Sequence, residues 1–233
     1  MGELEGMVAV VTGTAQGIGQ AIAKSIRDAG ATVHEVDKDT VDLSNSKAVE
    51  EFFRDVVGNL DILVNVAGGV VGQTHVPIDE LTDDEWDVVM NANLRTTFNC
   101  TRAAARTMKK QGYGRIVNIS SGAGRSVSLT GIQAYTSAKA AQIGFTRQMA
   151  HELGKFGITV NCVAPGFVLS NPTTQKQWES YGADGQRALL EKIAVRRTGT
   201  SEDIARGVRF FVAPDASWVS GQVLSIDGGH SLF

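Results

Sequence analysis

The chain has 233 residues, 42% of them hydrophobic and 20% charged, and its 25 acidic and 22 basic residues give a net charge of −3. This composition is typical of a soluble globular protein, and no cluster of Lys and Arg predicts nucleic-acid binding. We recognise neither a signal peptide nor an apolar run of membrane-spanning length, and therefore expect a cytoplasmic protein without membrane contact.

Strand-like apolar runs alternate with amphipathic helical patterns along the whole chain. The predicted strands cover residues 7–12, 31–36, 61–68, 114–120, 158–165 and 222–227. Helical patterns cover 17–29, 92–110 and 134–154, and capping boxes at Thr82–Glu85 and Thr200–Asp203 begin further helices. We predict an α/β fold, with a single Rossmann-type, doubly wound parallel sheet and helices on both faces. The whole of 1–233 is expected to form one domain, in which segment 167–200, without a strand pattern, is a candidate substrate lid.

The turn between the first strand and the first helix is rich in glycine. Gly13, Gly17 and Gly19 follow the spacing G-x-x-x-G-x-G, with Gln16 and Ile18 between them. Glycines at this point let the backbone approach a pyrophosphate, whose charge is favoured by the N-terminus of the helix. Taken alone, the pattern also fits a simple tight turn.

The second strand ends at Asp37. An acidic side chain at this position accepts hydrogen bonds from the ribose of an adenosine and repels a 2′-phosphate. Asp37 therefore predicts NAD as the cofactor and disfavours NADP. Considered by itself, Asp37 also fits a solvated turn, because Lys38 and Asp39 follow it.

Tyr135 and Lys139 lie four residues apart in the predicted helix 134–154, and Ser120 and Ser121 end the strand before it. The four-residue spacing places Tyr135 and Lys139 on one helix face. An ammonium there is expected to lower the pKa of the tyrosine from about 10, which makes the phenol a usable acid or base. Taken alone, Tyr135 fits an amphipathic interface residue better than a catalytic one.

With these features in this order, the sequence resembles the short-chain dehydrogenase/reductase family over nearly its whole length. The segment 65–68, Asn-Val-Ala-Gly, corresponds to the family's Asn-Asn-Ala-Gly, with valine at the second position. Further matches are Asn93-Leu94, the adenine-contacting pair Asp42-Leu43, Pro165-Gly166 with Val168 beside the nicotinamide, and Asp227-Gly228-Gly229. One departure is the short stretch between Asp37 and Asp42, which has no room for the family's usual helix.

The resemblance implies a role for each of four catalytic residues. Ser121 hydrogen-bonds the substrate oxygen, and Tyr135 exchanges a proton with it. Lys139 lowers the pKa of the tyrosine and holds the nicotinamide ribose, while Asn93 positions a water that links Lys139 to solvent. The implied cofactor-binding residues are Gly13, Gln16, Gly17, Ile18, Gly19, Asp37, Asp42, Leu43, Asn65, Ala67, Gly68, Tyr135, Lys139, Pro165, Gly166 and Val168. The resemblance also implies a homo-oligomer, a tetramer or a dimer.

The function expected from these residues is an NAD(H)-dependent oxidoreductase that interconverts a secondary alcohol and a ketone. Because NAD-linked enzymes usually serve oxidation, we expect a small polar alcohol, a sugar or a cyclic diol as the small-molecule substrate. A 3-oxoacyl-[acyl-carrier-protein] reductase is the alternative, although it would favour NADP and a basic docking patch. A non-catalytic dinucleotide-binding regulator is a third hypothesis, disfavoured by the complete catalytic set.

Several other side chains have no single interpretation. His34, His75, His151 and His230 lack ligand-like spacing, so we expect no metal site. Arg125 and Gln133 flank the catalytic serine and tyrosine, and either could contact substrate or solvent. The aromatic pair in the lid segment, Trp178 and Tyr181, fits a lid or an interface equally well.

Overall fold

The computed structural model describes residues 2–56 and 58–232, so residues 1, 57 and 233 of the predicted unit 1–233 lie outside the described residues. Six parallel strands form one sheet in the order β2-β1-β3-β4-β5-β6. The strands are β1 Val8–Thr12, β2 Thr32–Val36, β3 Ile62–Asn65, β4 Gly114–Ile119, β5 Ile158–Pro165 and β6 Val223–Ile226. The predicted Rossmann-type, doubly wound parallel sheet is confirmed.

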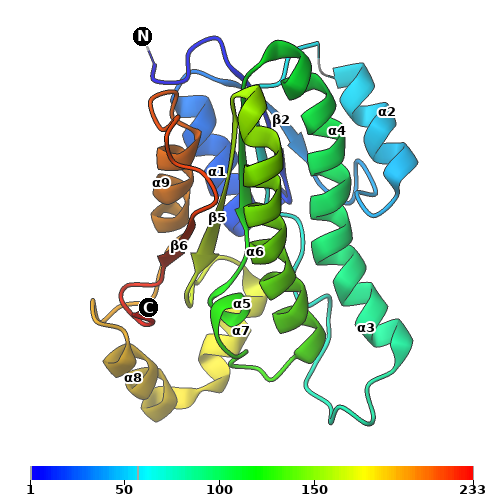
Figure 1. Ribbon diagram of the computed structural model, residues 1–233. Coiled ribbons are helices and arrows are strands. Elements are labelled where there is room, and N and C mark those ends of the chain that lie inside the picture. Colours follow the sequence, from blue (N-terminus) through cyan, green and yellow to red (C-terminus); the bar gives the residue numbers. More distant parts are fainter. Residues whose placement is uncertain (1, 57, 233) are drawn as a thin grey trace.

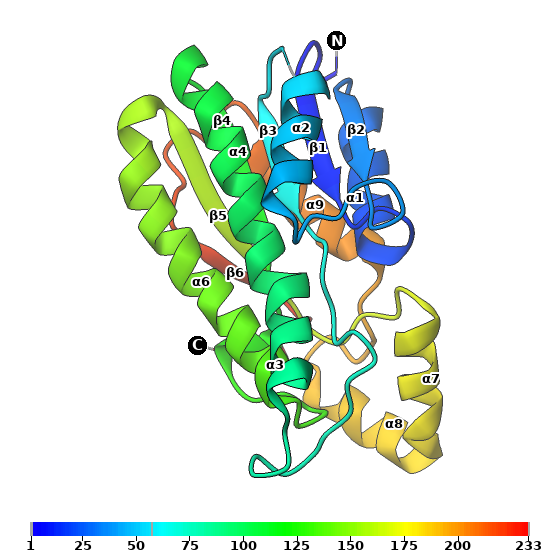
Figure 2. The same ribbon diagram turned by 90° about the vertical axis from the view of Figure 1, so that its right-hand side faces the viewer.

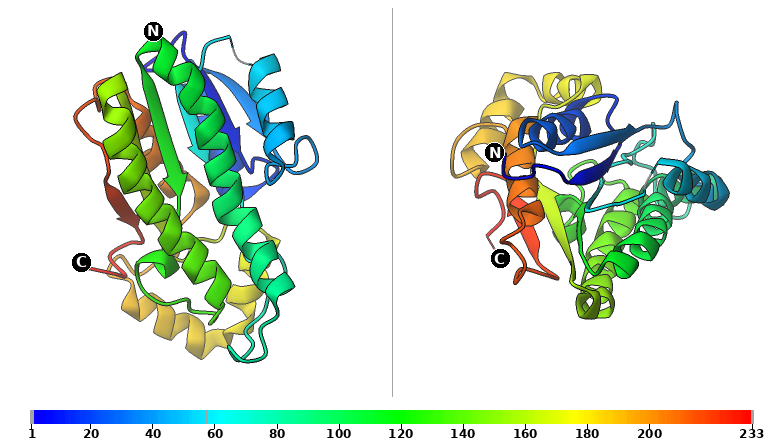
Figure 3. Two further views of the ribbon diagram at one scale, coloured as in Figure 1. Left: turned by 45° about the vertical axis from the view of Figure 1, so that its right-hand side comes forward. Right: turned by 90° about the horizontal axis from the view of Figure 1, so that it is seen from above.

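Helices cover both faces of the sheet. On one face lie α1 Gly17–Asp28 and α9 Ser201–Val212, and on the other lie α2 Ser46–Val56, α4 Thr96–Gln111 and α6 Gln133–Leu153 (Figures 2 and 3). Successive strand residues point to opposite faces. In β1, therefore, Ala9 and Val11 join the core under α1 and α9, whereas Val10 joins the core under the other three helices.

Strand β3 ends at Asn65, three residues before the end of the predicted strand 61–68. The amides of Val66 and Ala67 each donate to the hydroxyl of Thr12 on β1, over 3.0 Å. Because these two donors bond a side chain, they cannot continue the ladder of the sheet. The chain then turns away through Gly68, whose φ is +141°.

The predicted helix 92–110 is part of a longer helical stretch. Helix α3, Asp83–Met90, begins at the capping box of Thr82 and Glu85 that the sequence predicts. A π-helical turn, η1 Asn91–Arg95, joins it to α4. Single π-helical turns inside helices are uncommon and occur often at functional sites. The other predicted capping box, Thr200 with Asp203, is also confirmed and begins α9.

The predicted lid segment 167–200 contains two helices that no periodic pattern predicted, α7 Pro172–Ser180 and α8 Gly182–Lys192. Both lie beyond the carboxyl ends of the strands (Figure 1). The two ends of the segment are joined by a bridge between Val168 and Gly199. Short helices α5 Gly122–Arg125 and η2 Gly154–Phe156 complete the fold. No helix among the described residues is long and apolar enough to cross a membrane.

Candidate active site

A cleft of about 2240 Å³ opens at the carboxyl ends of the strands. It begins between β1 and β3. Strand β2 lies on one side of β1, and β3 and the later strands lie on the other, so the strand order reverses at this point. In open α/β sheets ligands bind at this switch point. The cleft wall brings together most of the predicted site residues, namely Gly13, Gln16, Ile18, Gly19, Asp37, Asp42, Leu43, Ala67, Gly68, Ser121, Tyr135, Lys139, Pro165, Gly166 and Val168.

The glycine turn forms one end of the cleft and fits a pyrophosphate group. A Cβ on Gly13 would lie 2.8 Å from the amide nitrogen of Ala67, and one on Gly19 would lie 2.0 Å from the carbonyl oxygen of Gly13. The backbone is therefore packed so closely that only glycine fits there. Helix α1 begins next to it without a side-chain cap and without an acidic residue in its first turn. Such uncapped amides favour an anion.

Asp37 lies beside this turn, as the sequence predicts. One carboxylate oxygen accepts the amide of Ala15 in the glycine turn over 2.9 Å, and the other accepts the amide of Lys38 over 2.7 Å. A carboxylate offers about four acceptor positions, so Asp37 retains acceptors for the two hydroxyls of a ribose. Asp42 accepts the amide and the hydroxyl of Ser44, and these hydrogen bonds lower the pKa of its carboxyl.

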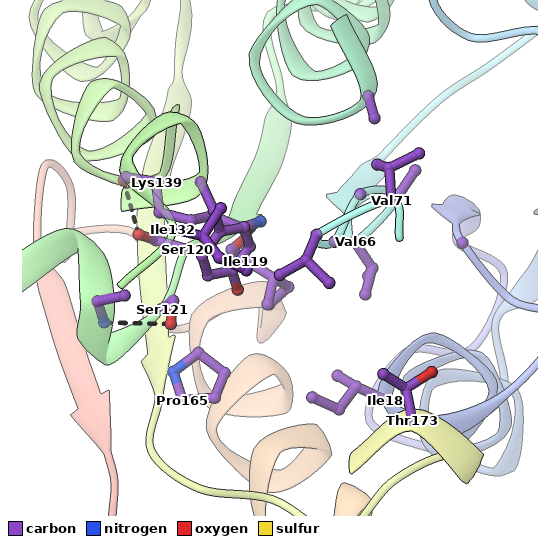
Figure 4. Close-up of a pocket in the computed structure, with 18 of the residues that line it drawn as sticks. Ile18, Val66, Val71, Ile119, Ser120, Ser121, Ile132, Lys139, Pro165 and Thr173 are labelled. Carbon is purple, nitrogen blue, oxygen red and sulfur yellow. Dashed lines mark hydrogen bonds between the residues drawn. The ribbon is translucent and has the colours of Figure 1, made fainter. Parts of the chain in front are cut away.

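The catalytic candidates come from β4 and α6. The hydroxyl of Ser120 donates to the backbone carbonyl of Lys139 over 2.8 Å, so this serine ties α6 to the sheet (Figure 4). The hydroxyl of Ser121 accepts the amide of Ala123 over 3.2 Å, lines the cleft and lowers the pKa of Tyr135 by hydrogen bonding. Both serines line the cleft, but the hydroxyl of Ser120 is already bonded to α6, which favours Ser121 as the serine that faces substrate.

The expected effect of Lys139 on Tyr135 is not seen in this structure. Burial raises the pKa of Tyr135 above its usual 10, against the smaller lowering by Ser121. The ammonium of Lys139 donates to the carbonyl of Ile119 over 2.9 Å and lies 5.7 Å from the centre of the tyrosine ring. Burial also lowers the pKa of Lys139 to about 8. Both pKa shifts have the same physical cause, because loss of water disfavours the charged form of each side chain.

Asn93, Asn65 and Gly17 do not belong to the cleft wall. The amide group of Asn93, in the π-helical turn, donates to the carbonyls of Gly69 and Val89, each over 2.8 Å, and its oxygen accepts the amide of Gly69 over 3.0 Å. Asn93 therefore holds the backbone that forms the wall. A Cβ on Gly17 would lie 2.7 Å from the carbonyl oxygen of Ser170, so this glycine accommodates the start of the lid segment.

Asn65 likewise lies behind the wall. Its side-chain amide donates to Asn118 over 2.8 Å and to Thr101 over 3.1 Å, which links β3 to β4 and α4. This agrees with support of the sheet. Val66, which stands where the family has its second asparagine, does line the cleft (Figure 4).

Other residues of the cleft wall were not singled out by the sequence. They come from the glycine-rich loop after β3, the loop before α6, and helix α7; examples are Val71, Leu129, Ile132, Thr173 and Gln177. One overlooked signal was Asn171 before Pro172, because Asn171 forms a capping box with Thr174 at the start of α7. The loops carry no comparable signal.

The four ambiguous side chains have internal partners. Arg125 donates to the hydroxyl of Ser225 over 2.8 Å, and Gln133 donates to the carbonyl of Val76 over 2.7 Å. The rings of Trp178 and Tyr181 both pack on Phe167, with centroids 5.9 Å apart in each pair. These contacts hold α7 against the end of β5.

Comparisons with known proteins agree with this geometry. The model of the enoyl-(acyl carrier protein) reductase family matches residues 39–231. The BbsD subunit of (2S)-[(R)-hydroxy(phenyl)methyl]succinyl-CoA dehydrogenase from Thauera aromatica is 35% identical, over 99% of this chain and 98% of the relative. The 3-oxoacyl-[acyl-carrier-protein] reductase FabG of Vibrio harveyi is 33% identical over 97% and 98%. A solved structure, a putative gluconate dehydrogenase from Agrobacterium tumefaciens, superposes with a TM-score of 0.88 at 28% identity, over 99% of this chain and 98% of that chain.

Proposed function

The chain belongs to the short-chain dehydrogenase/reductase family of oxidoreductases, and from this we propose that it is an NAD(H)-dependent enzyme that interconverts a secondary alcohol and a ketone. The preference for NAD over NADP rests on Asp37. Its carboxylate borders the glycine turn, where a 2′-phosphate on the neighbouring ribose would meet a negative charge. We propose a small polar alcohol, a sugar or a cyclic diol as the substrate.

The residues that would hold the dinucleotide follow the length of the cleft. Asp37 would bind the adenosine ribose, the uncapped start of α1 with Gly13 and Gly19 would bind the pyrophosphate, and Pro165 to Val168 would face the nicotinamide. When bound, the nicotinamide supplies or accepts the hydride, and the protein contributes orientation and charge.

The chain's own residues would handle the proton. Ser121 donates a hydrogen bond to the reacting oxygen, and Tyr135 gives a proton to that oxygen in reduction or takes it in oxidation. Because burial keeps the proton on Tyr135, the residue is set up as an acid, and hydrogen bonds to its oxygen are needed to make it a base. Lys139 is buried, and its pKa near 8 allows the ammonium to give up a proton at mildly alkaline pH. Asn93 acts through the backbone that it holds.

A 3-oxoacyl-[acyl-carrier-protein] reductase remains the second candidate, because FabG of Vibrio harveyi is 33% identical to this chain. Its acidic carrier protein needs cations around the entrance. Among the described residues of the cleft wall, the Lys and Arg side chains are Lys38 and Lys139, against five aspartates. This excess of negative charge favours an uncharged alcohol as the substrate over an acyl group on an acidic carrier protein.

Side-by-side fluorescence titration with NADH and NADPH tests the proposal. Tight binding of NADH with weak binding of NADPH, followed by NAD-dependent oxidation of neutral alcohols, is the expected result. Equal or reversed affinities would favour a 3-oxoacyl-[acyl-carrier-protein] reductase over an alcohol dehydrogenase. Tight NADH binding with no turnover on alcohols or ketones would favour a regulator.

A further inference from the structure

His75 is fixed against the loop that leads to Tyr135. Its Nδ1 lies 2.9 Å from the carbonyl oxygen of Gly131. Gly131 has a φ of +69°, and a Cβ on it would lie 2.9 Å from Nδ1 and 3.2 Å from Cγ of the imidazole. This position therefore requires glycine for its backbone conformation and for the close approach of the ring. His75 is exposed, and this contact restrains its imidazole on the wall of the cleft that Tyr135 and Ser121 also line.

The contact with Gly131 also assigns the tautomer of His75. A carbonyl oxygen only accepts hydrogen bonds, so Nδ1 must carry the proton. The neutral ring then presents Nε2 as an acceptor. A hydroxyl group is the uncharged ligand that such an acceptor fits, because it can donate a hydrogen bond without bringing a charge.

The charges around the cleft select against an anionic substrate. The cations on its described wall are Lys38 and Lys139; the first follows Asp37 at the adenosine end, and the second donates to the carbonyl of Ile119. Asp84 and Asp87 of α3 line the wall as well. A carboxylate or phosphate on the substrate would therefore lose its hydration without meeting a cation.

Building on the proposed function, we propose that His75 is a substrate-recognition residue, whose Nε2 accepts a hydrogen bond from a second hydroxyl of an uncharged diol or polyol. The reacting hydroxyl goes to Ser121 and Tyr135, and the second hydroxyl goes to His75. This narrows the substrate class to neutral compounds with at least two hydroxyls, or a hydroxyl beside the carbonyl in the reverse direction.

A purely structural role for His75 makes a different prediction. The loop that carries His75 has another anchor next to it, because Gln133 donates to the carbonyl of Val76 over 2.7 Å. If His75 only anchors the loop, loss of either hydrogen bond should have similar consequences. Gln133→Leu is therefore the matched control, since Gln133 does not belong to the cleft wall.

Asparagine and glutamine separate the two ends of the imidazole. In His75→Asn the side-chain amide can still donate to Gly131, but nothing replaces Nε2. In His75→Gln the longer side chain carries its amide to the position of Nε2, and the anchor to Gly131 is lost. Kinetics with two matched pairs, cyclohexane-1,2-diol against cyclohexanol and butane-2,3-diol against butan-2-ol, measure the contribution of the second hydroxyl. Gluconate serves as the anionic polyol.

We expect the wild-type protein to prefer each diol over its mono-alcohol and to oxidise gluconate poorly. His75→Asn should reduce kcat/KM for the diols roughly ten-fold, mainly through KM, and leave the mono-alcohols unchanged, because one hydrogen bond is lost. His75→Gln should retain part of the preference for diols. Gln133→Leu should retain the whole preference, and NADH affinity should be the same in all variants.

Three results would overturn the inference. A full diol preference in His75→Asn would show that His75 only anchors the loop, and so would the same loss of preference in Gln133→Leu. Preferred turnover of gluconate would show that the cleft accepts anions. In each of these cases the wild-type enzyme oxidises an alcohol, so the proposed function stands. If the wild-type protein binds NADH but oxidises no alcohol, the proposed function fails and the role of His75 fails with it.

Discussion

Replacement of Asp37 by asparagine should weaken the discrimination between NADH and NADPH. The carboxylate is half-buried, and its two oxygens are held by the amides of Ala15 and Lys38. Asparagine has nearly the same shape and keeps one oxygen for Ala15, so the substitution removes the charge together with the hydrogen bond from Lys38.

Coulomb's law gives the size of the effect. For a phosphate roughly 5 Å from the carboxylate and an effective dielectric constant of about 40–80, each unit of charge contributes about 0.8–1.7 kcal/mol. A 2′-phosphate carries about 1.5–2 negative charges at neutral pH, so the repulsion amounts to about 1–3 kcal/mol. Asp37→Asn should therefore raise NADPH affinity by about 5- to 150-fold. NADH affinity should fall several-fold, because the ribose loses a charged acceptor.

The assay is fluorescence titration of both cofactors on both proteins at low and moderate salt, because the repulsion is partly screened. Asp42→Asn is the matched control, since it removes a second carboxylate from the same end of the cleft. We expect it to leave the NADH/NADPH ratio unchanged. If the wild-type protein fails to discriminate, or if discrimination survives Asp37→Asn with the fold intact, another residue selects the cofactor.

Three further substitutions test the site and its energetics. Tyr135→Phe should lower kcat by about 10²–10⁴-fold without changing NADH affinity, and steady-state kinetics with an unchanged rate would exclude Tyr135 as the acid/base. Gly19→Ala should abolish cofactor binding and lower the melting temperature, because its Cβ would lie 2.0 Å from the carbonyl oxygen of Gly13. Lys139→Met should raise the free energy of unfolding of the cofactor-free protein by about 2 kcal/mol at pH 7. The buried ammonium opposes folding, as its pKa of about 8 indicates, and its removal is therefore stabilising. The hydrogen bond that is lost with it offsets only part of this gain. Between about pH 8 and 10.5 the unfolded wild-type protein binds more protons than the folded one, so the stability of the wild type rises with pH. Urea titrations of Lys139→Met should show no such rise.

The sheet and the cofactor end of the cleft could be predicted from the sequence because local patterns determine them. Apolar strands separated by helices can only be covered on both faces in a parallel sheet, and the carboxyl ends of such strands meet at one edge. The hydrogen bond between Asp37 and Ala15 follows from this arrangement, although 22 residues separate them.

The part of the cleft wall formed by α7 and by the loop that carries His75 could not be predicted, because tertiary contacts determine it. Helix α7 has little apolar periodicity, and it is held by the packing of Trp178 and Tyr181 on Phe167. The position of His75 depends on Gly131, which is 56 residues away along the chain and belongs to no regular element. Neither contact leaves a local pattern in the sequence.

The corrected direction of the Tyr135 pKa shows how burial and charge compete at this site. Spacing along a helix places an ammonium near a phenol, but it does not say how much water both groups lose. In the structure burial acts on both side chains: it raises the pKa of Tyr135, and it lowers the pKa of Lys139 to about 8. The two pKa values therefore move in the directions that favour the neutral form of each side chain. A ligand that donates hydrogen bonds to the phenol oxygen, or accepts them from the ammonium, opposes this tendency, because it favours the charged forms. Without substrate, Ser121 donates such a hydrogen bond to the phenol oxygen, whereas in the complex its single hydrogen goes to the reacting oxygen. A bound ribose can supply the acceptors for Lys139. The pKa values of Tyr135 and Lys139 thus depend on what occupies the cleft, and the four-residue spacing alone does not determine them.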